Sequence, residues 1–104
     1  MAKRTLRHPD IEPMHPGELL AEIVIPATGE DKSTIAERLG VSRQTLHSLL
    51  TRRQTVTPGL ALRLGKLFDN GADFWLNLQR AYDLWHLEKQ LRDELSAIQP
   101  IKAA

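Results

Sequence analysis

Apolar side chains recur along this chain at the three- and four-residue spacing of amphipathic helices, and no segment alternates as a half-buried strand would. The pattern predicts a first helix that opens around Pro16, because a proline near a helix start gives up no hydrogen bond. We expect Pro26 to end or bend this helix. Its apolar face consists of Leu19, Leu20, Ile23 and Val24.

Two short helices joined by a tight turn are predicted next. Asp31 suits the N-cap of the first helix, and Gly40 follows its end, where glycine adopts a positive φ at little cost. Ser42 suits the N-cap of the second helix, which is predicted to run through Leu50. The expected buried stripes are Ile35, Ala36 and Leu39 in the first helix and Leu46, Leu49 and Leu50 in the second.

Two further helices complete an all-α pattern of five predicted helices. Thr57 and Pro58 provide a cap followed by a first-turn proline, and Gly71 separates the helix that they start from the last one. The last helix is predicted to run from about Ala72 to about Ile98, because no glycine or proline interrupts that stretch.

The length of 104 residues is that of one small domain. We expect residues 1–13 to be a flexible N-terminal segment, residues 14–98 to form the domain with a C-terminal dimerisation helix, and residues 99–104 to be a tail. No apolar run is long enough to span a bilayer, so no membrane partner is expected and a cytoplasmic, nucleoid-associated protein is the default.

The net charge of +1 conceals an uneven distribution. Residues 1–37 carry four Lys or Arg against seven Asp or Glu, and residues 69–104 carry four against six. Residues 38–68 carry six basic side chains and no acidic one. A basic middle third on an otherwise acidic chain is typical of a surface that binds a polyanion. Charge alone, however, fits a solvated basic surface equally well.

Residues 32–50 have the pattern of a helix-turn-helix. Ala36 lets the second helix cross the first closely, Gly40 lies at the turn, and Val41 fills the angle between the helices, while Leu46 lies inside the second helix. Each position has a steric reason, so the set is more specific than any one member. An αα-hairpin that only packs is the alternative, and it leaves the basic charge unexplained.

In a helix-turn-helix, the start of the second helix points at base edges in the major groove. Arg43 can pair with guanine and Gln44 with adenine, each through two hydrogen bonds, and Ser48 lies one turn beyond Gln44 on the same face. The residues expected to contact phosphate are Lys32, Ser42, His47, Arg52 and Arg53. For His47, a solvent-exposed side chain without a DNA contact is an equal alternative.

Four blocks between residues 14 and 86 form a distinctive set. They are His15-Pro16-Gly17-Glu18 with Leu20, Leu39-Gly40-Val41-Ser42-Arg43-Gln44-Thr45, Ala61-Leu62-Arg63-Leu64, and Phe74-Trp75-Leu76-Asn77-Leu78-Gln79 with Tyr82-Asp83-Leu84-Trp85. With these blocks the chain resembles the HigA/VapI antitoxin family of Xre-type helix-turn-helix proteins. It departs from the family at Gly71-Ala72-Asp73, where Ser-Pro-Glu is usual, so a weaker cap is expected on the last helix.

The resemblance implies a lambda-repressor-like fold and a homodimer. It implies binding to a palindromic operator in double-stranded DNA, usually in the protein's own promoter. It also implies neutralisation of a HigB-like toxin, a ribosome-dependent mRNA endonuclease. A stand-alone Xre-type transcription regulator without a toxin partner is the alternative, and the sequence does not separate the two.

Beyond the resemblance, the end of the last helix carries a leucine stripe with coiled-coil-like spacing. It consists of Leu84, Leu87, Leu91 and Leu95, followed by Ile98. We expect the four leucines to form a dimer interface, because a helix from a second copy, or from a toxin, is the natural cover for such a stripe. Packing back onto the chain's own domain is the alternative.

Other function classes find little support in the sequence. It shows no nucleophile–base pair, paired-carboxylate cleft or phosphate-binding loop, so we do not expect an enzyme. The chain has no cysteine, and His8, His15 and His86 lack ligand spacing, so no metal or other cofactor is expected. A pure protein-interaction module leaves the acid-free stretch 38–68 unexplained.

Overall fold

The computed structural model describes residues 11–102, and within this range every regular element is a helix. The all-α prediction is therefore confirmed for the described residues. The elements are α1 (Pro16–Leu19), the π-helical turn η1 (Leu20–Val24), α2 (Ile25–Thr28), α3 (Lys32–Leu39), α4 (Arg43–Leu50), α5 (Pro58–Phe68), α6 (Ala72–Gln90) and α7 (Arg92–Ser96).

The first predicted helix continues through Pro26 as α1, η1 and α2. Within it the N–H of Ile25 donates to the carbonyl of Leu20, five residues back. A proline lacks an N–H and crowds the preceding turn, and the wider π turn makes room for it. Of the two outcomes expected at Pro26, an end of the helix is wrong, because the helix continues to Thr28, before Gly29 with φ 75°. The proline instead goes with the local distortion at η1.

Both predicted caps of the helix-turn-helix are confirmed. Asp31 accepts a hydrogen bond from the backbone N–H of Thr34 at the start of α3, and Ser42 accepts one from the N–H of Thr45 at the start of α4. Gly40 ends α3 with φ 75°, in the left-handed region that glycine adopts readily. These local interactions set where α4 begins.

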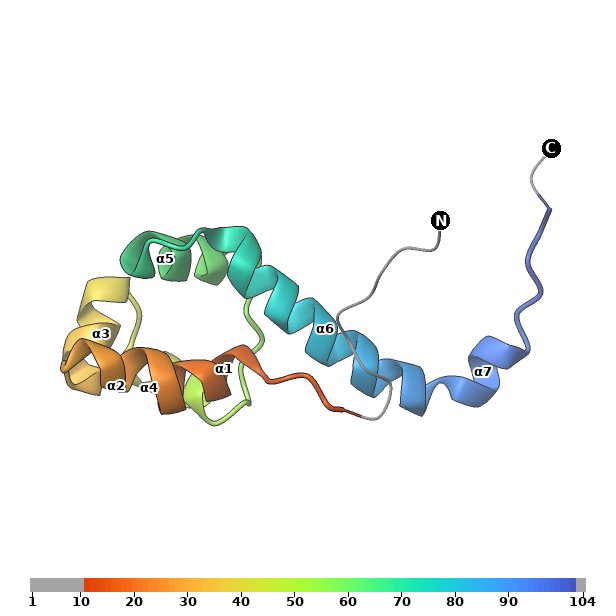
Figure 1. Cartoon of the computed structure of the whole chain (residues 1–104), viewed down its shortest axis with the longest axis horizontal. Coiled ribbons are helices and arrows are strands. Elements are labelled where there is room, and N and C mark those ends of the chain that lie inside the picture. The colour runs from red at the N-terminus through yellow and green to blue at the C-terminus, as the bar shows by residue number, and fades with distance from the viewer. Residues whose placement is uncertain (1–10, 103–104) are drawn as a thin grey trace.

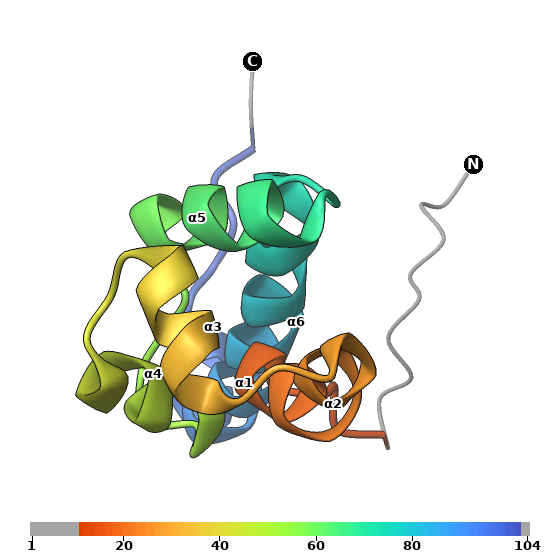
Figure 2. The same cartoon turned by 90° about the vertical axis from the view of Figure 1, so that its left-hand side faces the viewer.

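A single core lies where the helices meet. α1 packs on α4 and α6, α3 packs on α4 and α5, and α5 packs on α6. Figure 2 shows this arrangement with α3 and α4 on one side of the body. The largest fully buried side chains are Trp75, Leu20, Leu46, Leu49, Leu64 and Pro16.

The C-terminal part of α6 leaves this body and gives the molecule its elongated shape, with extents of 52 × 27 × 24 Å (Figure 1). The prediction of one uninterrupted helix to Ile98 was wrong. Leu91, with φ −98° and ψ 12°, separates α6 from α7. α7 has no buried residue. Its main contacts are with α6, so no packing against the body holds the helix continuous here.

The chain ahead of α1 runs back along α6. Glu12 lies 2.6 Å from the Nε2 atom of His86, and the ring of His15 packs edge-on against Tyr82. Residues 1–10 of the predicted flexible segment and residues 103–104 of the predicted tail lie outside the described residues. None of the described helices combines the length and apolar character needed to cross a bilayer.

Candidate nucleic-acid interface

The solvent-facing side of α4 carries the residues predicted to contact bases. Arg43 and Gln44 are exposed in its first turn, and Ser48 is half-buried one turn later. Leu46 and Leu49 hold the opposite side of the helix in the core. The helix therefore presents polar side chains outward from a fixed position, as base reading requires.

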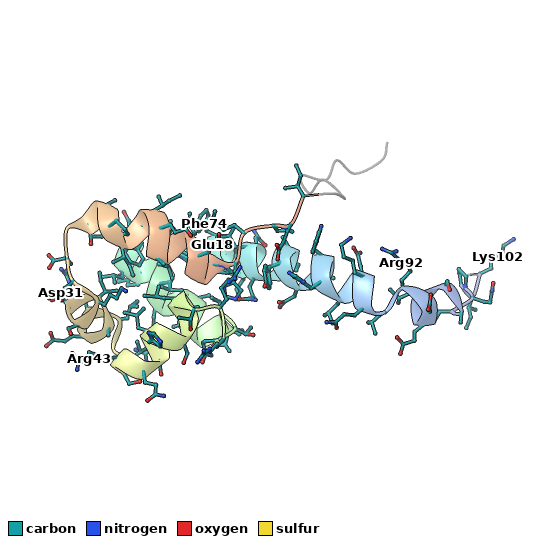
Figure 3. The ribbon with its side chains drawn as sticks, turned by 90° about the horizontal axis from the view of Figure 1, so that it is seen from below. Glu18, Asp31, Arg43, Phe74, Arg92 and Lys102 are labelled. Atoms are coloured by element: carbon teal, nitrogen blue, oxygen red, sulfur yellow. The ribbon has the colours of Figure 1, made fainter. Side chains whose placement is uncertain are left out.

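Arg43 leans toward the start of α3. Its Nη1 atom donates a hydrogen bond of 2.7 Å to the hydroxyl of Ser33. Hydrogen bonding from Thr34, together with a smaller effect of the Arg43 guanidinium, lowers the pKa of the Asp31 carboxyl. Figure 3 shows Asp31 and Arg43 at the same end of the molecule. The bond to Ser33 engages one N–H group, and the remaining N–H groups of the guanidinium are left for pairing with a guanine.

Ser42 is engaged within the cap of α4. Its hydroxyl accepts from the N–H of Thr45 at 3.0 Å and donates to the Thr45 hydroxyl at 2.9 Å. A phosphate near Ser42 would therefore be held mainly by the N–H groups in the first turn of α4, which point outward at any helix start.

The two arginines that follow α4 differ in their surroundings. Arg52 has a positive φ of 65°, and its guanidinium lies 3.8 Å from the carboxylate of Glu18. Arg53 is exposed and forms no ion pair with another of the described residues. Lys32, in the first turn of α3, and His47, on α4, are likewise exposed. Of the two arginines, Arg53 is the more accessible to a phosphate.

The block His15-Pro16-Gly17-Glu18 forms one support of α4. The Nδ1 atom of His15 accepts from the N–H of Gly17 at 2.9 Å and caps α1. A Cβ atom at Gly17 would lie 1.7 Å from the carbonyl oxygen of Leu49, so only glycine allows α1 this close to the end of α4. Glu18 adds the contact with Arg52. The block carries part of the family resemblance, but its role in supporting α4 is not evident from the sequence.

His15 is buried, with 3% of its surface exposed. Burial lowers the pKa of its imidazole below the ordinary value of 6.5, as does the nearby Arg52, whereas Asp83 and Glu18 act in the opposite direction. The neutral ring keeps Nδ1 available as the acceptor that caps α1. His15 is therefore a structural residue.

Gln79 forms a second support that sequence reasoning missed. Its Oε1 atom accepts from the backbone N–H of Val56 at 2.9 Å, and its Nε2 atom donates to Asp83 at 3.0 Å. These bonds hold the loop after α4 against α6. A signal was present in the sequence, because Gln79 follows Trp75 by four residues and so places an amide on the apolar face of the helix.

No family model matches the chain. Among curated relatives, the helix-turn-helix transcriptional regulator YbaQ of Escherichia coli K12, itself called uncharacterized, is 36% identical over 92 residues, which are 86% of this chain and 81% of the relative. The antitoxin HigA-1 of Vibrio cholerae is 30% identical over 89 residues, which are 86% of this chain and 84% of the relative.

A solved structure gives the same picture at the level of the fold. The antitoxin GraA in complex with its operator superposes with a TM-score of 0.81 and 37% sequence identity, over 95% of this chain and all of GraA. The structural likeness therefore includes the helix-turn-helix and the long helix after it.

Proposed function

Because this chain belongs to the HigA family of helix-turn-helix antitoxins, we propose that it binds a palindromic operator as a homodimer, represses its own operon and neutralises a HigB-like toxin. The observation that carries the DNA part is the outer face of α4. Arg43 and Gln44 are exposed there, in a stretch from residue 38 to residue 68 that has no acidic side chain. The related GraA, which shares this fold, is described in complex with its operator.

Base reading is assigned to Arg43, Gln44 and Ser48. Gln44 is the strongest candidate for a base contact among the three, because it is exposed at the start of α4 and can pair with adenine through two hydrogen bonds. Phosphate contacts are assigned to Lys32, Ser42, His47, Arg52 and Arg53. Arg53 is the clearest of these, since it is exposed just beyond α4.

The homodimer is supported by the leucine stripe of α6 and α7. The exposed fractions of Leu84, Leu87, Leu91 and Leu95 are 42%, 46%, 37% and 44%. A substantial part of each of these side chains stays exposed to solvent, so a second copy is the cover that we propose for them. A palindromic operator needs two copies of α4 about one helical turn of DNA apart, and a dimer supplies them.

The DNA part is tested by fluorescence anisotropy on two duplexes at several salt concentrations. One duplex carries the promoter ahead of the chain's own gene, and the other is a scrambled sequence of equal length. Gln44→Ala should narrow the affinity ratio of the two, because a bidentate base contact is worth about 1–3 kcal/mol against a wrong base. Arg53→Ala should weaken both equally and reduce the salt slope by about one.

An unchanged ratio in Gln44→Ala would contradict the placement of α4 in the major groove. Reading of DNA shape by the basic residues would then be the better account. The toxin part is tested by co-expression with the adjacent gene followed by affinity purification. Copurification of a small protein whose toxicity the chain suppresses is the expected result, and a chain that purifies alone but still represses its promoter would be a stand-alone regulator.

A further inference from the structure

Arg63, on α5, reaches across to the turn of the helix-turn-helix. Its Nη1 atom donates a hydrogen bond of 2.8 Å to the carbonyl of Leu39 and a longer one of 3.4 Å to the carbonyl of Gly40. These residues are 24 and 23 positions away in the sequence. A single side chain thus connects α5 with the segment that ends α3 and leads into α4.

The turn is shaped to receive this guanidinium. Gly40 has a φ of 75°, and a Cβ atom at this position would lie 2.6 Å from the Nη1 atom of Arg63. Gly29 has the same φ of 75°, but nothing lies within 4 Å of a Cβ built there. Gly40 therefore serves two purposes, since it supplies the left-handed backbone and leaves the space that Arg63 occupies.

The contact is favourable on general grounds. The last carbonyls of a helix have no donor within the helix, and the C-terminus of a helix attracts positive charge. The guanidinium of Arg63 supplies both a donor for the Leu39 carbonyl and a positive charge at the C-terminal end of α3. The part of α5 that carries Arg63 is anchored in the core, because Ala61 and Leu64 on the same helix are fully buried.

We infer that Arg63 is a positioning residue for base reading: by holding the turn before α4, it fixes where Arg43 and Gln44 stand over the DNA. α4 is then held from both ends, by Arg63 at the turn and by the close approach of Gly17 to Leu49 at the far end. The inference rests on the proposed DNA binding and adds a residue that itself touches no base.

The first test compares Arg63→Met with Lys66→Met by anisotropy on the promoter duplex and the scrambled duplex. Lys66 is the matched control, because it is an exposed cation on α5 that lines the same surface pocket as Arg63 and Leu39, and its loss also removes one charge. Arg63→Met should lower the promoter-to-scrambled affinity ratio about tenfold, which is the scale of one base contact. The ratio should be unchanged in Lys66→Met, and Arg63→Lys should recover part of the loss.

The salt slope separates positioning from a phosphate contact. If Arg63 held a phosphate, Arg63→Met would weaken both duplexes equally and lower the slope by about one. If Arg63 is a positioning residue, Arg63→Met should have the same salt slope and the same affinity for the scrambled duplex as Lys66→Met. Circular dichroism and the melting temperature establish that each variant is folded at the temperature of the assay.

The second test uses the glycines. Gly40→Ala and Gly29→Ala both place an alanine at a φ of 75°, but only the Gly40 variant forces Arg63 away. Gly40→Ala should therefore lower the melting temperature more than Gly29→Ala does, and it should reproduce the loss of the affinity ratio. In an Arg63→Met background, Gly40→Ala should lower the melting temperature no more than Gly29→Ala does, because the clash with Arg63 is gone.

If the two glycine substitutions lowered the melting temperature equally in the wild-type background, the contact between Arg63 and the turn would be overturned. A full affinity ratio in Arg63→Met would overturn the positioning role and leave the proposed function intact. A wild-type chain that binds both duplexes equally would overturn the proposed function, and the positioning role with it.

Discussion

The side-chain oxygen of Gln79 accepts a hydrogen bond of 2.9 Å from the backbone N–H of Val56, and both residues are buried. A buried backbone donor without a partner is costly, so this bond determines where the loop after α4 runs. The same loop carries Arg52 and Arg53, two of the proposed phosphate contacts. An amide on α6 thus helps to shape the side of the molecule that we propose faces the DNA.

Gln79→Met should lower the free energy of unfolding by about 1–3 kcal/mol, because the side chain keeps its length but leaves the Val56 N–H unsatisfied. Urea denaturation followed by circular dichroism measures this change. Gln90→Met is the control, since Gln90 is exposed near the end of the same helix and should tolerate the substitution. A Gln79 variant as stable as the control would mean that water or another group replaces the lost acceptor.

His15 should make the stability of the domain depend on pH. Burial lowers the pKa of its imidazole below 6.5, so the unfolded chain takes up this proton at a higher pH than the folded chain does. The contribution of His15 is therefore fully present above about pH 6.5 and is lost as the pH falls through the lowered pKa. Protonation would also remove the Nδ1 acceptor that caps α1.

Urea denaturation at pH 7.5 and at pH 5 tests this dependence in the wild type and in His15→Asn. Asparagine is a good N-cap but does not titrate, so the variant should lose less stability on acidification than the wild type. Every other titrating group is common to both proteins. Equal losses would show that protonation of His15 does not oppose folding.

Local signals predicted the parts of the fold that neighbouring residues determine. The caps at Asp31 and Ser42 and the left-handed backbone of Gly40 at the end of α3 depend on contacts within a few residues, and the structure confirms all three predictions. The buried side of α4 also followed from helical spacing, because Leu46 and Leu49 repeat at three residues. The chain therefore specifies the outline of the helix-turn-helix locally.

Contacts between distant residues could not be predicted in this way. Arg63 is 24 residues from Leu39, and Gln79 is 23 residues from Val56, so no periodicity relates the partners. The prediction of where α6 ends was wrong for a related reason. Leu91 is a good helix former, and only the lack of packing beyond the body distinguishes its position from one inside the helix.

The proposed dimer predicts a specific effect of charge on the leucine stripe. Leu91→Asp should shift the protein at micromolar concentration from twice the monomer mass to the monomer mass, and it should lower the affinity for the promoter duplex. Truncation after Trp85 should have the same effect while the body stays folded. The reason is that a buried unpaired carboxylate, or the loss of the apolar surface, removes the driving force for association.

Sedimentation equilibrium measures the mass, and Gln90→Asp provides the control, because it adds the same carboxylate one residue away from the stripe. A wild-type monomer that still binds the promoter tightly would contradict the dimer. Unfolding of the truncated chain would show that residues beyond Trp85 stabilise the body.

Arg52 allows backbone strain and DNA binding to be measured at one position. Its φ of 65° lies in the left-handed region, where a residue with a Cβ costs roughly 1–2 kcal/mol. Arg52→Gly and Arg52→Ala both remove the guanidinium and its contact with Glu18, and they differ mainly in that strain. Arg52→Gly should therefore be more stable than Arg52→Ala by about 1 kcal/mol.

Both Arg52 variants should weaken the promoter and scrambled duplexes equally and reduce the salt slope by about one, as expected for a lost phosphate contact. Asp69 is the control, because it also has a positive φ, of 57°, and is not among the residues assigned to DNA. Asp69→Gly should exceed Asp69→Ala in stability without changing the salt slope. A salt slope that also stays unchanged in the Arg52 variants would assign the guanidinium to Glu18 alone, because a side chain that neutralises no phosphate releases no counterion on binding.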